Sequence, residues 1–340
     1  MTLARALRAL AVVLGALAAA AAGGAAWLAH GLAPLDPAAP AALFAVPRGS
    51  TLSSVGRRLE ADRLVRSALA FEALGRWEGA APKLHWGEYE LSAAMAPREI
   101  LAAMVEGRVK TWDVVLPEGL TAREIVDRLV AAGVAEREAL DDALRAPGAA
   151  ARFGVEGPGL EGYLFPDTYR LPRGLSPNEI VVTLVARFAR AWAPLAPVAA
   201  AQGLSQREVV TLASIVEKET GLAAERPLVA GVFRNRLRLG MRLESDPTVI
   251  YGIPAFDGNL RRVHLDDAAN PYNTYQITGL PPGPIASPGE ASLRAVLEPA
   301  DTKALYFVGR GDGSHAFSER YDDHVRAVNQ YQRSQRRNGR

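Results

Sequence analysis

Residues 205–221 read Ser205-Gln-Arg-Glu-Val-Val-Thr-Leu-Ala-Ser-Ile-Val-Glu-Lys-Glu-Thr-Gly221, and this run predicts a well-marked helix. Ser205 and Glu208 have the spacing of a capping box, in which each side chain binds the other residue's backbone amide at a helix N-terminus. Apolar side chains then recur at helical spacing from Val209 to Val216, and Gly221 stands where a helix commonly ends.

Two carboxylates close this helix, one on each side of Lys218. Residues two apart on a helix differ by about 200° around its axis. Glu217 and Glu219 therefore lie on opposite edges of the apolar stripe, and only one of them can face a given cleft. The edge of Glu217 also carries Val210 and Ala213, a partly apolar setting that raises a carboxyl pKa as a general acid requires. Because a Glu-Lys-Glu run at a helix end is more often a solvated surface, the residues alone leave both readings open.

Three polar segments follow the helix: a turn at 244–248, the run Asn270-Pro-Tyr-Asn-Thr-Tyr-Gln276, and a rigid Pro/Gly loop at 279–289. Tyrosine rings stack on pyranose faces, and amides bind hydroxyl and N-acetyl groups, so these segments suit sugar binding. Ordinary turn chemistry with structural aromatic residues is the alternative for each of them.

The N-terminus decides the compartment. Residues 9–29 contain no charged side chain, and 21 residues are enough to cross the hydrocarbon core as a helix. Arg5 and Arg8 precede the run and no Lys or Arg follows before Arg48, which places the N-terminus in the cytoplasm and the rest of the chain outside. The small residues at 19–22 leave a cleaved signal peptide as the alternative. Prolines within residues 30–42 predict a short stiff linker after the anchor.

Two segments about 70 residues apart resemble each other. In each, an apolar strand ends at Pro-x-Gly and a Thr precedes a helix, as in residues 44–51 and 114–121. Short strands ending at Leu91 and Leu171 then lead into helices that begin with Pro and carry Glu two residues later. The first copy predicts a compact β-α-β-α unit of the LysM-like type, which is either glycan-binding or a spacer.

Composition excludes several classes of function. The 340 residues carry a formal net charge of only +2, which gives no electrostatic basis for nucleic-acid binding. The absence of cysteine rules out disulfides and thiolate chemistry, and five scattered histidines without ligand spacing predict no metal site and no cofactor.

Six ordered motifs make the chain resemble the endolytic murein transglycosylase (YceG-like) family over nearly its whole length. They are Glu161-Gly-Tyr-Leu-Phe-Pro-Asp-Thr-Tyr169, Leu212-Ala-Ser-Ile-Val-Glu-Lys-Glu-Thr220, Gly240-Met-Arg-Leu-Glu-Ser-Asp-Pro-Thr-Val-Ile-Tyr-Gly252, Tyr272-Asn-Thr-Tyr275, Gly279-Leu-Pro-Pro-Gly283 and Leu305-Tyr-Phe-Val308. The resemblance implies an α+β chain with residues 1–8 as a cytoplasmic tail, 9–29 as a transmembrane helix, 30–42 as a linker, 43–110 as the LysM-like module and 111–340 as the catalytic domain.

The same resemblance implies a lyase that cuts the β-1,4 bond between N-acetylmuramic acid and N-acetylglucosamine without water, leaving a 1,6-anhydro end. Its catalytic residue falls on Glu217, with Glu219 in reserve. We expect the substrate to be held by Asn273, Tyr275, Asp246 and Thr248, and secondly by Glu161, Tyr163, Asp167 and Tyr169, which are alternatively braces of the domain.

The implied setting is the bacterial inner membrane, with nascent glycan strands as substrate and peptidoglycan synthases as partners. Two other readings stay open at this point. One is a non-catalytic peptidoglycan-binding scaffold. The other is a two-carboxylate hydrolase in which Asp246 or Glu244 assists, leaving a reducing muramic acid.

Overall fold

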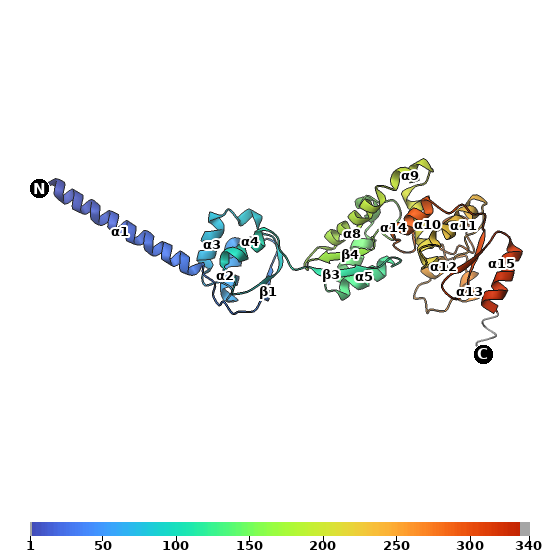
Figure 1. Cartoon of the computed structure of the whole chain (residues 1–340), viewed down its shortest axis with the longest axis horizontal. Helices are drawn as coiled ribbons and strands as arrows, with labels where there is room; N and C mark the ends of the chain where they lie inside the picture. The colour runs from blue at the N-terminus through green and yellow to red at the C-terminus, as the bar shows by residue number, and fades with distance from the viewer. Residues whose placement is uncertain (1, 334–340) are drawn as a thin grey trace. The chain divides into compact units, whose positions relative to one another are not determined.

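A computed structural model of the chain describes residues 2–333 (Figure 1), so Met1 of the expected cytoplasmic tail and residues 334–340 of the expected catalytic domain lie outside it. The chain divides into two compact units. Unit 1 comprises residues 1–112 with 172–174, and unit 2 comprises residues 113–171 and 175–340.

An apolar helix, α1 (Thr2–Gly31), begins unit 1. Its stretch Leu7–Gly31 contains an 18-residue window with a mean hydropathy of 2.0 and no buried residue, so by length and composition it is able to cross a membrane. The residues after it are not a detached spacer. Leu35 and Asp36 donate their backbone N–H groups to the carbonyl of Ala93, and Leu32 packs on the core of unit 1.

The rest of unit 1 is a small α+β module. Its elements are β1 (Ala42–Val46), α2 (Leu52–Ala61), α3 (Ala68–Trp77), the 3-10 turn η1 (Ala81–Lys83), β2 (Gly87–Leu91) and α4 (Pro97–Val105). β1 and β2 pair antiparallel with Phe44 opposite Tyr89. The expected β-α-β-α order was wrong, because two helices separate the strands. Arg63 adopts a left-handed backbone conformation that ends the first helix, and Ser67 caps the second.

Unit 2 begins with a second copy of this order. It runs through β3 (Trp112–Leu116), α5 (Ala122–Ala131), α6 (Arg137–Arg145), the short α7 (Ala149–Arg152), β4 (Asp167–Leu171) and α8 (Pro177–Trp192), and β3 pairs with β4. The likeness extends to single hydroxyl groups. Tyr89 donates to the carbonyl of His85 at 2.7 Å, and Tyr169 donates to that of Phe165 at 2.6 Å. The structure thus agrees with the duplication predicted from the sequence, whereas the likeness to LysM modules stays a prediction.

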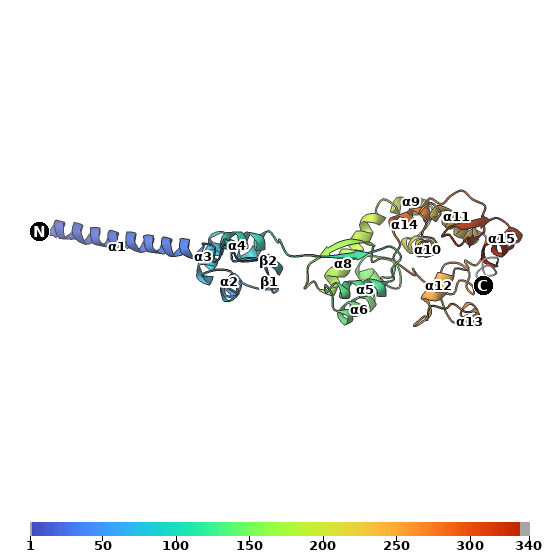
Figure 2. The same cartoon turned by 60° about the horizontal axis from the view of Figure 1, so that its bottom comes forward.

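The C-terminal part of unit 2 is mostly helical (Figure 2). Its elements are α9 (Ala196–Ala201), α10 (Gln206–Glu219), α11 (Arg226–Arg238), α12 (Asp246–Tyr251), α13 (Arg262–Leu265), α14 (Glu290–Leu297), β5 (Tyr306–Gly309), β6 (His315–Ser318), α15 (Tyr321–Val328) and the π-helical turn η2 (Asn329–Arg333). α10 packs against α11, α12 and α14, so every residue from Val209 to Val216 is buried rather than a single stripe. The mixed α+β class expected from the sequence is confirmed.

Candidate active site

The two carboxylates in the last turn of α10, Glu217 and Glu219, lie in different surroundings. The buried run of the helix stops at Val216, and the helix ends after Glu219 with Thr220 as its C-cap. Glu217 and Glu219 emerge on opposite sides of this end, as the helical geometry predicts. Their partners belong to different segments of the chain, so each can be assessed separately.

Glu217 is held on both of its oxygens. Arg226 donates to Oε1 at 2.9 Å, and the backbone N–H of Gly289 donates to Oε2 at 3.0 Å. The side chain is only 6% exposed. Arg226 also contacts Glu118 at 3.3 Å, so one guanidinium joins two carboxylates. These contacts make Glu217 part of a closed ion-pair cluster.

Glu219 instead lines a cavity of about 470 Å³ together with Asp246, Tyr275 and His315. The hydroxyl of Ser245 donates a hydrogen bond to its Oε1. The pKa of Glu219 is raised to about 7, chiefly by burial and also by the charge of Asp246, although the Ser245 hydrogen bond and the charge of His315 act to lower it. A carboxyl group with this pKa is protonated in a large fraction of molecules at neutral pH, which suits a general acid.

Ser245 is fixed by two threonines behind the cavity. Its backbone N–H donates to Oγ1 of Thr274 at 2.9 Å, and the Thr248 hydroxyl donates to its carbonyl at 2.7 Å. The two threonine hydroxyls lie 2.8 Å apart, and both residues are fully buried. Thr248, expected to bind substrate, therefore positions the hydroxyl that contacts Glu219 and does not line the cavity itself.

Tyr275 and Asp246 meet at the cavity, where the phenol donates to Oδ1 of Asp246 at 2.7 Å. Burial and this hydrogen bond raise the pKa of Tyr275, so the group stays a neutral phenol. Both residues line the cavity of Glu219, the reserve candidate of the sequence analysis, and Glu217 is not among the residues that line it.

Asn273 does not reach the cavity. Its Nδ2 donates to the carbonyls of His264, Leu265 and Asp267, and its Oδ1 accepts the N–H of Tyr275. The side chain is fully buried. Because its polar atoms already bind the backbone of its own loop, Asn273 holds the loop that carries Tyr275 and is not free to bind an acetamido group.

The lining of the cavity also contains two groups that sequence reasoning missed, His315 and Arg236. The backbone N–H of His315 donates to Oε1 of Glu225 at 2.9 Å, and the ring Nδ1 of His315 lies 2.6 Å from Oε2 of Glu225. Arg236 is buried and binds the carbonyl of Leu305 and the carboxylate of Glu244. These contacts join positions up to 90 residues apart, and no local pattern in the sequence signals them.

Comparison with known proteins identifies the family. The model of the YceG-like family matches residues 44–330. The chain belongs to the YceG-like family. A YceG-like protein of Listeria monocytogenes is 30% identical and superimposes with a TM-score of 0.59, over 85% of this chain and 99% of that one.

The chain is also similar in sequence to two proteins that are named endolytic murein transglycosylase. The endolytic murein transglycosylase of Bacillus subtilis is 28% identical over 308 residues, covering 84% of this chain and 83% of the relative. That of Streptococcus pneumoniae is 26% identical over 319 residues, and the match covers 83% of this chain but 57% of the relative. This YceG-like chain thus spans just over half the length of the pneumococcal protein.

The segment 161–169 of this YceG-like chain lies away from the cavity and braces unit 2. Glu161 accepts the N–H of Ala122, the first residue of α5, at 2.9 Å and the hydroxyl of Tyr251 at 3.1 Å. Burial raises the pKa of Glu161 to about 7. Tyr163 is fully buried and donates to the carbonyl of Glu156.

The other two residues proposed in this segment also contact the protein itself. Tyr169 makes the hydrogen bond to Phe165 already described, and Asp167 is an exposed partner of Arg187 at 2.5 Å. That hydrogen bond lowers the pKa of Asp167. None of the four lines the cavity of Glu219, so their contacts agree with the bracing alternative.

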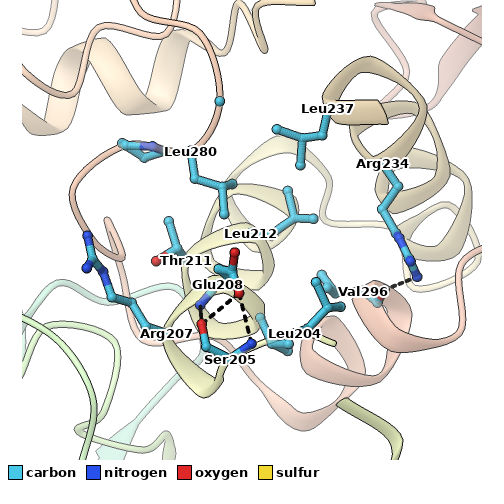
Figure 3. Close-up of a pocket in the computed structure, with 13 residues that line it drawn as sticks. Leu204, Ser205, Arg207, Glu208, Thr211, Leu212, Arg234, Leu237, Leu280 and Val296 are labelled. Carbon is cyan, nitrogen blue, oxygen red and sulfur yellow. Dashed lines mark hydrogen bonds between the residues drawn. The ribbon is translucent and has the colours of Figure 1, made fainter. Parts of the chain in front are cut away.

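A second cavity, of about 730 Å³, lies at the other end of α10 (Figure 3). Its walls are largely aliphatic and include Leu212, Leu237 and Leu280. The carboxylate in its lining, Glu208, is occupied by the Ser205 hydroxyl and N–H that cap α10, and these bonds lower its pKa. This cavity lacks a carboxyl group able to donate a proton at neutral pH.

Proposed function

We propose that this chain is an endolytic murein transglycosylase, the activity for which its Bacillus subtilis and Streptococcus pneumoniae relatives are named. The observation that carries the proposal is the carboxyl group of Glu219, which has a pKa of about 7 and lines a cavity with Tyr275 and Asp246. A lytic cut needs one group that first donates and then accepts a proton, and a carboxyl with a near-neutral pKa is suited to both steps.

We assign the catalytic role to Glu219 and not to Glu217, which the family resemblance had suggested first. Both oxygens of Glu217 already bind protein groups, and its side chain is almost completely covered. A substrate would have to displace Arg226 or Gly289 to reach it. The one side-chain hydrogen bond to Glu219 in the described part of the chain comes from Ser245, and Glu219 lines a cavity, which Glu217 does not.

The reaction then needs no second carboxylate. Protonated Glu219 gives its proton to the oxygen of the β-1,4 bond, and the bond from that oxygen to C1 of N-acetylmuramic acid breaks. The C6 hydroxyl of the same sugar forms a new bond to C1, and the Glu219 carboxylate accepts the hydroxyl proton. No water is consumed, and the intramolecular attack makes positioning a large part of the acceleration.

The other polar groups of the cavity hold the substrate. Tyr275 and Asp246 present a phenol and a carboxylate beside Glu219, which suits sugar hydroxyl and acetamido groups. Ser245 donates to Glu219 and so steadies the carboxylate between its two proton transfers.

The proposed function includes a location at the cytoplasmic membrane. α1 anchors the protein in the cytoplasmic membrane with Arg5 and Arg8 on the inner side, and the two units act outside on growing glycan strands. Peptidoglycan synthases as partners remain a prediction from the family resemblance.

The products test the activity directly. We expect the wild-type protein to convert uncrosslinked glycan strands into internal fragments that end in 1,6-anhydro-N-acetylmuramic acid, detected by mass spectrometry. Reducing muramic acid ends would indicate a hydrolase instead. Binding of strands without any new ends would indicate a scaffold, and either result would overturn the proposal.

The rate should also depend on pH. Because the acid form of Glu219 is lost as pH rises through about 7, kcat/KM should fall about tenfold per unit at pH values well above that. The same pH profile of kcat/KM is measured for the Glu244→Gln variant, because Glu244 is another carboxylate that lines this cavity. A rate that is constant from about pH 6 to pH 9 would contradict the assignment. The other groups of the cavity that titrate or carry charge are Asp246, Tyr275, Arg236, His315 and His324.

A further inference from the structure

Helix α3 of unit 1 is apolar on two faces. Its inner face, with Phe71 and Leu74, is buried in the core of the module. Its outer face carries Leu69 and Trp77, which are 68% and 89% exposed. Ala73 lies between them at helical spacing and is also exposed, so the three form one stripe. We call Leu69, Ala73 and Trp77 the outer stripe.

α3 is also the element that α1 contacts. A Cβ at Gly31, the last residue of α1, would lie 2.7 Å from the Cβ of Ala70 in α3, so the two helices touch at this point. Both views place α3 at the edge of the module from which α1 leaves, with β1 farther away (Figures 1 and 2).

The connection from α1 into the module is short and tied down. Arg66, just before α3, donates to the carbonyls of Pro34 and Leu35 at 2.9 and 3.1 Å. The backbone N–H groups of Leu35 and Asp36 also donate to the carbonyl of Ala93. These hydrogen bonds hold the module against the end of α1. A module fixed in this way stays at the membrane surface when α1 is inserted in a bilayer.

We propose that the outer stripe of α3 rests in the headgroup region of the bilayer that holds α1. An exposed tryptophan and leucine on one helix face suit this region, where an amphipathic indole is stable at the boundary of water and hydrocarbon. Arg76, which is exposed and pairs at 2.6 Å with the partly buried Glu72, borders the stripe and places an ionic group among the lipid headgroups. The stripe then orients the module on the membrane, which α1 as a single helix does not do.

This inference rests on the proposed insertion of α1, so the experiment measures insertion separately. The chain has no cysteine, which permits labelling at one introduced site. Full-length Ala73→Cys carries a fluorescent probe in vesicles of phosphatidylethanolamine and phosphatidylglycerol with a nitroxide on the lipid headgroup. The matched control is Leu43→Cys on β1, where the native side chain is 51% exposed. Flotation of each sample with its vesicles reports insertion of α1.

We expect the probe at position 73 to be quenched at least about twofold more strongly than the probe at position 43. Adding Leu69→Ser and Trp77→Ser should remove this difference while flotation is unchanged. Equal quenching at both positions in samples that float would overturn the proposal. A blue-shifted probe at position 73 without lipid quenching would indicate a protein partner or a second copy on the stripe, and would overturn it too. Samples that do not float would refute insertion of α1, and with it this inference, while leaving the activity of unit 2 untouched.

Discussion

Glu219→Gln should reduce the rate of formation of 1,6-anhydro ends by about 10³-fold, which lies within the usual range for removal of a general acid. Glutamine keeps the shape of the side chain and an oxygen that accepts the Ser245 hydroxyl, so the cavity remains intact. It has no proton to give to the glycosidic oxygen and no carboxylate to receive one from the C6 hydroxyl. The rate is measured by mass spectrometry of the products, and thermal unfolding checks that the variant is folded.

Glu217→Gln is the matched control, because it makes the same chemical change two residues away on the same helix. Glutamine keeps one acceptor oxygen, enough for Arg226 or for the N–H of Gly289 but not for both, and position 217 does not line the cavity of Glu219. We therefore expect some loss of stability but a rate within about tenfold of the wild type in the folded variant. If Glu217→Gln abolished the activity while Glu219→Gln preserved it, the catalytic role would return to Glu217.

Arg226→Met should lower the free energy of unfolding by about 3 kcal/mol, the low end of the range for breaking a buried ion pair on one side. The variant leaves Glu217 with a single hydrogen bond, from Gly289, in a site where it is 6% exposed. Glu118 loses the same partner, and burial and the charge of Glu217 already raise its pKa. Urea unfolding at neutral pH measures the change.

Two further variants separate the lost ion pair from the lost packing. Arg226→Met combined with Glu217→Gln removes the uncompensated charge, and we expect it to recover at least about 1 kcal/mol. Arg294→Met removes an exposed partner of Glu290 and Glu298 and should change stability by no more than about 0.5 kcal/mol. Equal effects of Arg226→Met and Arg294→Met would show that the cluster around Glu217 contributes little.

Local features of the fold were predictable because they depend on neighbours in the chain. The capping residues Thr51, Thr121 and Ser205 all accept a backbone amide at the start of the expected helix. In unit 1 the helix absent from the sequence analysis was α3. It is capped by Ser67 and is separated from α2 by a left-handed residue at Arg63, a conformation for which arginine is not a usual signal.

The substrate-binding candidates were only partly predictable. Asp246 and Tyr275 line the cavity of Glu219, and Thr248 lies directly behind it. Asn273 is of a residue type that commonly binds sugars, but its Nδ2 donates to three backbone carbonyls of its own loop. Residue type indicates what a side chain is able to bind, whereas burial decides whether a ligand can reach it.

The two carboxylates at the end of α10 show which properties follow from the sequence and which depend on the tertiary structure. Helical periodicity alone established that Glu217 and Glu219 face different surroundings, since the angle between them follows from the backbone geometry. Only the folded chain supplies those surroundings, because Arg226 and Gly289 cover one residue while Ser245 and His315 stand at the other. These partners come from separate segments brought together by packing, and the resulting desolvation raises the pKa of Glu219 to about 7.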